Sequence, residues 1–567
     1  MSTKGNSLTR RQILKVAGTT AFVASAGSLL AACAPAAPDN SAVPAAAVPT
    51  AVPSTAVPTA VPATAVPATE VPTPAPVSLA EIIYGYGSEA IILDMADAID
   101  GPSQDITDNL HEGLLEMGPD GEILPALAKS WQLQDDGLTW TFFLRSDVQF
   151  HDGTIFNSKA VKFNFDRVMT EALGHANLGQ WAPYISEVRV VDEFTVEIVT
   201  FKPYASLKLK LADSWGKLMN SPAAVEEFGA DYGRNPVGTG PFMFESWSPG
   251  EHIVLARNPN YWRTGPGVET LRFRPISEGS VRLLALEGGD IQIINQVPAQ
   301  SLAMLRENAR VLVQQKTTTR LFYWAFNHTK GAWKNPMVRQ ALNHAIDRQS
   351  IVDNMLFGVG EVATSFVSPS VPSSVSFSDY QYDPELARSL LKKAGYDFDY
   401  VATCYATEGR YYQDRQVAEA IQGMMAQVGI QINLEILEWG AFVDAIWFTP
   451  ADSPVAQARD FMQTSFGSND PPTWMNQTLH TNAWPKDGFN EAFYSNAKVD
   501  SLIDDANRIA DVEAQSKIVR TIQNELRADP PWIISHFEQA VIAHSANLTG
   551  ISIWPSGHVN FREVRSI

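Results

Sequence analysis

The sequence predicts an α/β protein that follows an export signal and a long extended tether. Strand-like stretches, such as 81–87 and 430–437, are interleaved with stretches that have the 3.6-residue period of helices, such as 158–169 and 413–428. The two kinds of stretch alternate without a sequence repeat. This alternation favours a mixed α/β architecture over a helix bundle or a β-sandwich.

The elements follow one another in order along the chain. A short buried strand is expected at Glu81–Gly87. Alternating apolar residues on either side of Asp135-Asp136-Gly137 predict a hairpin of strands 131–133 and 138–144. After a turn at 150–154, a helix is expected at Ser158–Met169 with Ser158 as its cap. Further helices are expected at 335–354, 384–394, 413–428 and 500–528, and a strand at 430–437.

The N-terminus has the pattern of an export signal. The paired Arg10 and Arg11 precede an apolar run at 16–30, which is too short for a permanent membrane span. The start resembles a twin-arginine signal, and Leu-Ala-Ala before Cys33 resembles a lipobox, in which the cysteine becomes the lipidated first residue. Residues 1–33 are therefore predicted to be an export signal with lipidation at Cys33. Two alternatives stay open: general export, and an ordinary cleaved signal with an incidental cysteine.

Residues 34–77 consist almost entirely of Ala, Val, Pro, Thr and Ser. Such a segment has too little bulky apolar surface to form a core, and its evenly spaced prolines favour extended polyproline II. At roughly 3 Å per residue it could hold a domain up to about 100 Å from the membrane. We expect a disordered tether, or an O-glycosylated stalk, without a site of its own.

Composition excludes several kinds of partner. The chain has 42 Lys and Arg against 62 Asp and Glu, a formal net charge of −20, with no long basic run after the signal. This argues against nucleic acid and anionic lipid as partners. Besides Cys33 the only cysteine is Cys404, so neither an internal disulfide framework nor a cysteine-based metal site is predicted.

An ordered set of motifs from about residue 80 to the C-terminus resembles the dipeptide/oligopeptide/nickel-type solute-binding proteins of ABC importers (solute-binding protein family 5). The match includes Pro-Val-Gly-Thr-Gly-Pro-Phe at 236–242 and Arg-Asn-Pro-Asn-Tyr-Trp at 257–262. The other segments in the same order are Asn109–Leu115, Asp120–Trp131, Asp136–Phe142, Val148–Gly153, Phe326–Asn327, Val338–Arg348, Asp383–Pro384, Gly429–Ile432 and Ser495–Asp500.

The resemblance implies a periplasmic-binding-protein-like fold (type II, cluster C), with two large lobes around a hinged cleft and an extra inserted lobe. Lobe I would comprise 78–113, 237–315 and 545–567, the inserted lobe II 114–236, and lobe III 316–544. It also implies a receptor without cofactor or catalytic activity, which we expect to be monomeric. Together with the lipobox at Cys33, this would place a lipid-anchored receptor on the outer face of the cytoplasmic membrane or in the periplasm. Hinge closure on a small solute would present that solute to the permease and ATPase subunits.

Enzyme-like fragments are weak in this chain. Gly85-Tyr86-Gly87 fits a degenerate dinucleotide pattern, but no second parallel strand follows at the required distance. Gly238-Thr239-Gly240 lacks the lysine of a phosphate-binding loop and suits a tight backbone reversal. His151-Asp152 is better explained as a capped turn than as a catalytic pair. A carboxylate pair carries no local signature, so an anchored extracytoplasmic hydrolase such as a glycosidase stays the competing class.

The expected ligand loop is Ser465–Trp474. Peptide-binding relatives carry an aspartate here that pairs with the peptide α-amino group, but this chain has Asn469 when it is aligned on Phe466. An amide cannot neutralise a buried ammonium, so peptide binding would require the neighbouring Asp470. Arg410 lies about two positions from the relatives' carboxylate-binding arginine. A surface position for Arg410 is the alternative.

Aromatic residues in the same region suggest a second ligand class. Trp439 and Trp474, with Phe466, could stack on a sugar ring, and some members of this family bind oligosaccharides. The alternative is that most of these rings belong to the core. The histidines are scattered, with no close pair in sequence, so no metal site is predicted. A peptide or peptide-like amine is ranked above an oligosaccharide.

Overall fold

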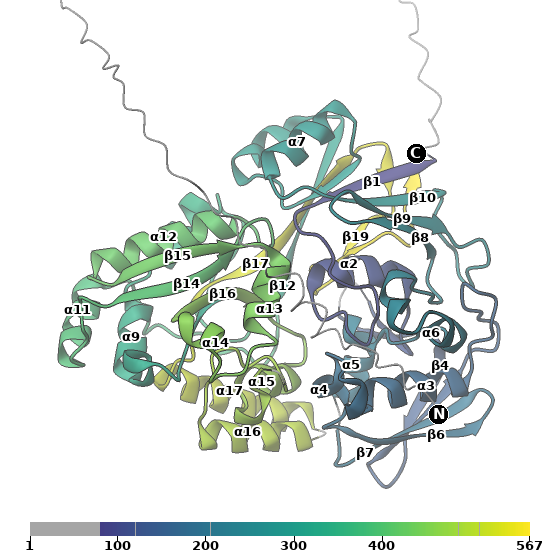
Figure 1. The fold of residues 1–567 in the computed structure, drawn as a ribbon, viewed down its shortest axis with the longest axis horizontal. Helices are drawn as coiled ribbons and strands as arrows, with labels where there is room; N and C mark the ends of the chain where they lie inside the picture. Colours follow the sequence, from purple (N-terminus) through teal and green to yellow (C-terminus); the bar gives the residue numbers. More distant parts are fainter. Residues whose placement is uncertain (1–79, 119–120, 205, 486, 510) are drawn as a thin grey trace, which may run out of the picture. The chain divides into compact units, whose positions relative to one another are not determined.

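The computed structural model describes residues 80–567 except 119–120, 205, 486 and 510 (Figure 1). The predicted export signal, Cys33 and the predicted tether at 34–77 lie outside the described residues. Within the described part of the chain, no helix is both long and apolar enough to cross a bilayer.

One mixed sheet of 11 strands runs through the described chain, in the order β15-β14-β16-β12-β17-β11-β1-β10-β9-β8, with β13 paired to β17. The long β12 and β17 pair antiparallel over most of their length and join the two ends of this sheet (Figure 1). The strands are β1 Glu81–Tyr86, β8 Phe242–Ser248, β9 His252–Arg257, β10 Thr270–Pro275, β11 Ile293–Asn295, β12 Val311–Phe326, β13 Glu361–Val362, β14 Val401–Thr407, β15 Gln431–Leu437, β16 Phe461–Phe466 and β17 Trp532–Ser545.

Helices of 336–528 surround the β14–β16 end of this sheet. Their buried faces form one hydrophobic core with β12, β16 and β17, which includes Trp324, Trp333 and Trp532. The helices are α9 Pro336–His344, α10 Arg348–Ser350, α11 Pro384–Lys393, α12 Asp414–Gln427, α13 Trp439–Ile446, α14 Pro454–Ala458, α15 Pro471–Leu479, α16 Ala497–Arg508 and α17 Val512–Ala528. At the other end, α2 Gly101–Leu110, α7 Gly279–Gly288 and α8 Leu302–Glu307 accompany β1 and β8–β11, with two short strand pairs near the C-terminus, β18 Leu548–Thr549 with β21 Arg565–Ser566 and β19 Ser552–Ile553 with β20 Val559–Asn560.

Segment 114–236 contains a separate four-stranded sheet, in the order β4-β5-β7-β6, and its own hydrophobic cluster around Phe142, Phe165 and Trp181. Its elements are β2 Leu115–Met117, β3 Ile123–Pro125, β4 Ala128–Leu133, β5 Thr139–Leu144, α3 Ser158–Met169, α4 Leu178–Trp181, β6 Ile185–Asp192, β7 Thr195–Thr200, α5 Leu207–Ala212 and α6 Pro222–Phe228. Short 3₁₀ turns connect several of these elements.

Most of the predicted elements are present, with three differences. Asn157, not Ser158, caps α3, because its side-chain oxygen accepts from the backbone N–H groups of residues 159 and 160. The helix expected at 335–354 is interrupted after α9, where Arg348 turns inward and donates to the carbonyls of Asn343 and Ile534. The helix expected at 500–528 is two helices, α16 and α17, and the side chain of Asp511 caps the second.

The Gly238-Thr239-Gly240 turn packs directly against the end of α2. A Cβ at Gly238 would lie 2.1 Å from the Leu110 carbonyl oxygen, so close approach of two backbones requires glycine here. His151 holds the same turn: its Nδ1 accepts from the Gly238 N–H at 3.2 Å, and its Nε2 lies 3.0 Å from the Gly240 carbonyl oxygen. His151 is therefore a structural residue, and burial lowers its pKa to about 4.

Candidate functional site

The predicted ligand loop forms one wall of a small cavity. The loop begins where β16 ends at Phe466 and continues to Asp470, which precedes the Pro-Pro start of α15. A Cβ at Gly467 would lie 2.0 Å from the Thr319 carbonyl oxygen, so the loop passes directly over β12. The cavity has a volume of about 30 Å³, and Phe466, Asn469, Asp470 and Trp474 all line it.

Asp470 is one of two carboxylic acids among the described residues that line this cavity, together with Asp213. Asp470 is only 5% exposed, and one of its carboxylate oxygens accepts from the Ser206 hydroxyl at 2.8 Å. The other oxygen, Oδ2, is buried and accepts no hydrogen bond of ordinary geometry from the described residues. Burial raises the pKa of Asp470 above its ordinary value, although the nearby Thr473 hydroxyl and backbone N–H act to lower the pKa of this carboxyl group. A buried carboxylate oxygen without a well-placed donor is costly, so this atom is poised to accept from a ligand.

Lys210 brings a cationic group to the same cavity from α5. Its ammonium donates to the Gln180 side-chain oxygen at 3.1 Å and lies over the rings of Tyr184 and Trp181, at 4.7 and 5.1 Å from their centroids. Burial lowers the pKa of Lys210 to about 7. Asp213 also lines the cavity, and burial raises its pKa. The cavity therefore presents both signs of charge.

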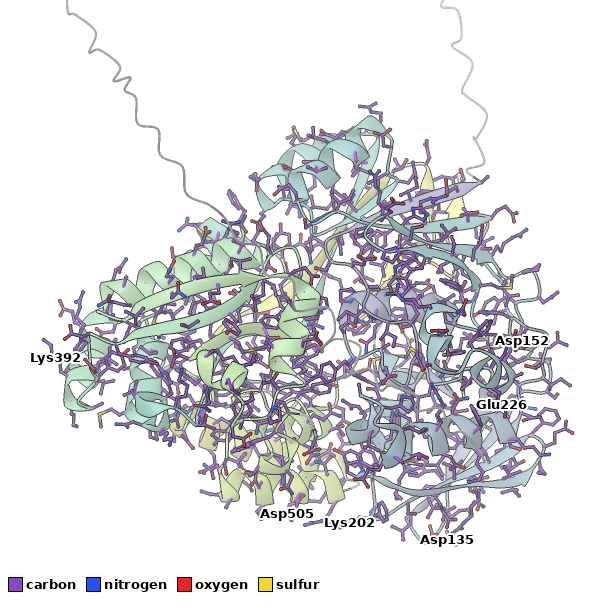
Figure 2. All side chains as sticks on the ribbon, in the orientation of Figure 1. Asp135, Asp152, Lys202, Glu226, Lys392 and Asp505 are labelled. Atoms are coloured by element: carbon purple, nitrogen blue, oxygen red, sulfur yellow. The ribbon has the colours of Figure 1, made fainter. Side chains whose placement is uncertain are left out.

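A second, larger cavity of about 350 Å³ adjoins the first, because Gln180 and Gln477 line both. Its walls combine the rings of Trp447, Phe448 and Phe489 with amides and with charged groups. The indole N–H of Trp447 is buried without a hydrogen-bond partner among the described residues. Lys202, labelled in Figure 2, lines this cavity as well. Its volume falls within the range of small-molecule sites.

Arg410 lines a third cavity, of about 100 Å³, beside the crossing strands β12 and β17. Its guanidinium stacks over Tyr411 and Trp439 at 4.6 and 4.8 Å from the ring centroids. Its Nε is buried without a hydrogen-bond partner among the described residues. In the same cavity Arg320 pairs with Glu538 at 3.1 Å, and burial raises the pKa of Asp105 to about 6.

The structure thus brings together four of the six residues predicted from sequence, and it places Arg410 and Trp439 elsewhere. The side-chain amide of Asn469 donates to the Met117 sulfur at 3.1 Å, so the protein itself already occupies this donor. Sequence reasoning did not identify Lys210, Ser206, Gln180 or Gln477, which lie in segments whose folding toward the loop no local motif reveals. The sequence signal available for Lys210 is its position in Leu-Lys-Leu-Lys-Leu-Ala at 207–212, where a lysine two residues from Lys208 cannot share its helix face.

One group of metal-type ligands occurs among the described residues, at Asp94, Asp97 and His175. Asp94 forms a buried ion pair with Arg167, and the Asp97 carboxylate lies 3.1 Å from His175 Nδ1 while also accepting from the Ala176 N–H. These protein partners account for the arrangement, and no metal is needed to explain it.

Comparison with known proteins identifies the family. The model of the bacterial extracellular solute-binding proteins, family 5, matches residues 122–486. The glutathione-binding protein GsiB of Salmonella typhi is 32% identical over 484 residues, which cover 85% of this chain and 93% of that protein. The chain belongs to this family. It is a solute-binding protein of family 5, and the type II fold predicted from sequence is confirmed.

Solved structures show the same fold at lower identity. The dipeptide-binding protein of Pseudoalteromonas sp. SM9913, in complex with Met-Leu, has a TM-score of 0.80 at 23% identity and covers 86% of this chain and 100% of its own. The ABC transporter-associated periplasmic binding protein DppA of Helicobacter pylori, in complex with the peptide STSA, has a TM-score of 0.78 at 24% identity, over 86% and 98% of the two chains. At this identity the likeness concerns the fold.

Proposed function

We propose that this protein is the receptor of an ABC importer and binds a peptide or peptide-like solute through the Asp470 carboxylate. The observation that carries the proposal is the buried Asp470 Oδ2, which lines a cavity and lacks a well-placed donor among the described residues. A solute ammonium would supply that donor in a charge-assisted hydrogen bond. The names of the relatives support this choice, because they bind glutathione, a dipeptide and a tetrapeptide.

Asp470, rather than Asn469, would bind the solute ammonium. The Asn469 amide is engaged with Met117, whereas Asp470 is the anionic residue of the loop and is held by Ser206. Phe466, at the end of β16, would pack against the bound solute. Arg410 would hold a solute carboxylate only if the solute reached the third cavity, because Arg410 lines neither of the other two.

The predicted lobes fit a closing mechanism. Lobes I (78–113, 237–315, 545–567), II (114–236) and III (316–544) would move about β12 and β17. Segments 114–236 and 316–544 touch around the candidate site: Tyr204 hydrogen-bonds Thr473 at 2.6 Å, and Asn476 donates to Tyr184 at 2.7 Å. Opening would break these contacts and admit the solute, and the closed form would be the one that the permease recognises.

The oligosaccharide alternative has less support from the aromatic residues. Trp474 is 3% exposed and packs against Trp532, and Trp439 stacks on Phe442 beneath the Arg410 guanidinium. These contacts use the ring faces that a sugar would need. The hydrolase alternative receives no support from the relatives, which are named as binding proteins.

The N-terminal features complete the proposal. Export through the twin-arginine route, lipidation at Cys33 and the tether at 34–77 would hold a monomeric receptor at the outer face of the cytoplasmic membrane or in the periplasm, within reach of its permease and ATPase partners. A diacylated cysteine is the expected form, because a single acyl chain binds a bilayer only marginally.

Calorimetric titration of the full chain, purified in mild detergent, tests the proposed function. Glutathione, di- and tripeptides, and hexose oligomers would be titrated separately. Saturable binding of at least one peptide without turnover is expected. Binding of sugars alone, or hydrolysis of any of these compounds, would contradict the proposal.

A further inference from the structure

The candidate site holds a cation beside its carboxylates, where a simple amine anchor would need only a carboxylate. Lys210 and Asp470 line the same cavity, and no ion pair within 4.0 Å joins them. Both are almost fully buried, at 4% and 5% exposure. Asp213 lines the cavity too, but its side chain accepts from the Ser214 N–H at 2.8 Å, and it forms no ion pair within 4.0 Å with Lys210. Lys210 and Asp470 therefore bear the cost of desolvation without the compensation of direct contact.

A solute that carries both an ammonium and a carboxylate at one end would satisfy both groups. The Asp470 oxygen without a well-placed donor would accept from the ammonium, and the Lys210 ammonium would bind the carboxylate. An ordinary peptide does not have this end, because its first α-carboxyl group is consumed in the peptide bond. A peptide whose first residue is linked through its side-chain carboxyl group keeps the α-amino and α-carboxylate groups on one carbon.

We propose that Lys210 and Asp470 together select solutes with a free α-amino-acid head, such as γ-linked peptides, over ordinary α-linked peptides. This inference rests on the proposed function, and it adds Lys210 as the residue that determines specificity. The Gln180 side-chain oxygen accepts from the Lys210 ammonium and so orients it. The rings of Trp181, the last residue of α4, and of Tyr184, three residues later, lie beside the same ammonium.

The space beside the pair agrees with this assignment. The cavity between the two charges, at about 30 Å³, holds little more than water, so the head would enter when Ser206 and Asp470 separate. The remainder of the solute would extend past Gln180 and Gln477 into the cavity of about 350 Å³. There the Trp447 indole N–H, which has no partner among the described residues, and Lys202 are available to its polar groups.

Two isomeric tripeptides test the inference. γ-Glutamyl-cysteinyl-glycine and α-glutamyl-cysteinyl-glycine have the same atoms and formal charge, and they differ in which carboxyl group of glutamate forms the peptide bond. Both would be titrated by calorimetry, under reducing conditions, into the full chain and into its Lys210→Met variant. Methionine keeps an unbranched stem beside the two rings and removes the ammonium.

The wild-type protein is expected to prefer the γ-isomer by about tenfold or more, the usual effect of one hydrogen bond between charged groups. Lys210→Met should lose that preference by weakening the γ-isomer alone. The matched control is Lys208→Met on the same helix, whose ammonium lies over Trp140 and outside the cavity. This control should keep the preference.

Each outcome separates the two proposals. Equal affinity of the wild-type protein for both isomers, or a preference for the α-isomer, would overturn the inference and leave the proposed function standing. Preservation of the γ-preference in Lys210→Met, with an unchanged unfolding temperature, would overturn the role of Lys210. If neither isomer nor any other peptide bound, the proposed function itself would fail, and the inference with it.

Discussion

Asp470 and Lys210 line one buried cavity from two distant segments of the chain, yet no ion pair within 4.0 Å joins their charges. Asp470 instead hydrogen-bonds Ser206, and Lys210 hydrogen-bonds Gln180. Each charge thus has a neutral protein partner and spare hydrogen-bonding capacity. This arrangement suits a binding site in which a charged solute replaces the hydrogen bonds to Ser206 and Gln180.

Asp470→Asn should weaken peptide binding by about 10- to 100-fold, because a neutral amide replaces the acceptor of a charge-assisted hydrogen bond. Calorimetry on the wild-type and variant chains would measure the change. Asp505→Asn, at the exposed position labelled in Figure 2, is the matched control and should bind normally. Unchanged affinity in Asp470→Asn would remove this residue from the site.

The affinity for a γ-linked peptide should decline as the pH rises from 6 to 9. Burial lowers the pKa of Lys210 to about 7 in the ligand-free protein, so the ammonium that binds the carboxylate is progressively lost above that value. Titrations at several pH values would measure this trend. Lys210→Met should show a flatter profile over the same interval, and an equally steep decline in that variant would assign the effect to another group.

Gly238→Ala should destabilise the fold, because its Cβ would collide with the Leu110 backbone oxygen. Gly423→Ala is the opposite case. Gly423 is exposed within α12, and a Cβ there would meet nothing within 4 Å. Its replacement should raise the free energy of unfolding by about 0.5–1 kcal/mol through helix propensity. Thermal and denaturant unfolding would measure both, and a stabilised Gly238→Ala variant would contradict the close packing at 238–240.

His151→Ala should lower the free energy of unfolding by about 1–3 kcal/mol at neutral pH, since the Gly238 N–H and the Gly240 carbonyl lose their partner. The pKa of His151 is about 4 in the folded protein and near 6.5 when unfolded. Between these values the unfolded chain binds the extra proton, so wild-type stability falls as the pH drops from about 6.5 to 4. The difference between wild-type and variant, measured by denaturant unfolding at several pH values, should therefore shrink over that interval. A constant difference would contradict this assignment.

Cys33→Ala should release the protein from membranes, because the lipobox would no longer carry its anchor. Fractionation of cells that express the wild-type or variant chain would measure this. The conservative replacement of Arg10 and Arg11 by Lys tests the route separately: twin-arginine export should stop, whereas general export would persist. Membrane retention of Cys33→Ala would show that residues 30–33 are not a lipobox.

The sequence could predict the fold and one wall of the site, but not the other wall. Motifs such as 236–242 indicated the family, and local apolar periodicity predicted the hairpin and helix α3, because these signals lie close together in the chain. The loop at 466–474 was found for the same reason. Lys210 and Ser206 lie more than 250 residues earlier, and their approach to Asp470 depends on the packing of segment 114–236 against α15. No local pattern encodes that approach.

Solvent-facing and packed aromatic residues could not be told apart by sequence either. Trp439 and Trp474 are residues of the kind that stack on sugars, but their rings are packed against other side chains.

The break in the helix expected at 335–354 could not be predicted for a related reason. Arg348 looks like a helix surface residue by its charge, yet it is buried and satisfied by carbonyls from a distant strand.

Native mass spectrometry of the protein, purified from its host without refolding, tests the central claim most directly. A receptor closed around its solute retains that solute through purification, and the mass difference between bound and denatured protein identifies its composition. We predict a bound mass that corresponds to a small peptide or an amino-acid conjugate. A bound mass that corresponds to a hexose oligomer would contradict the account.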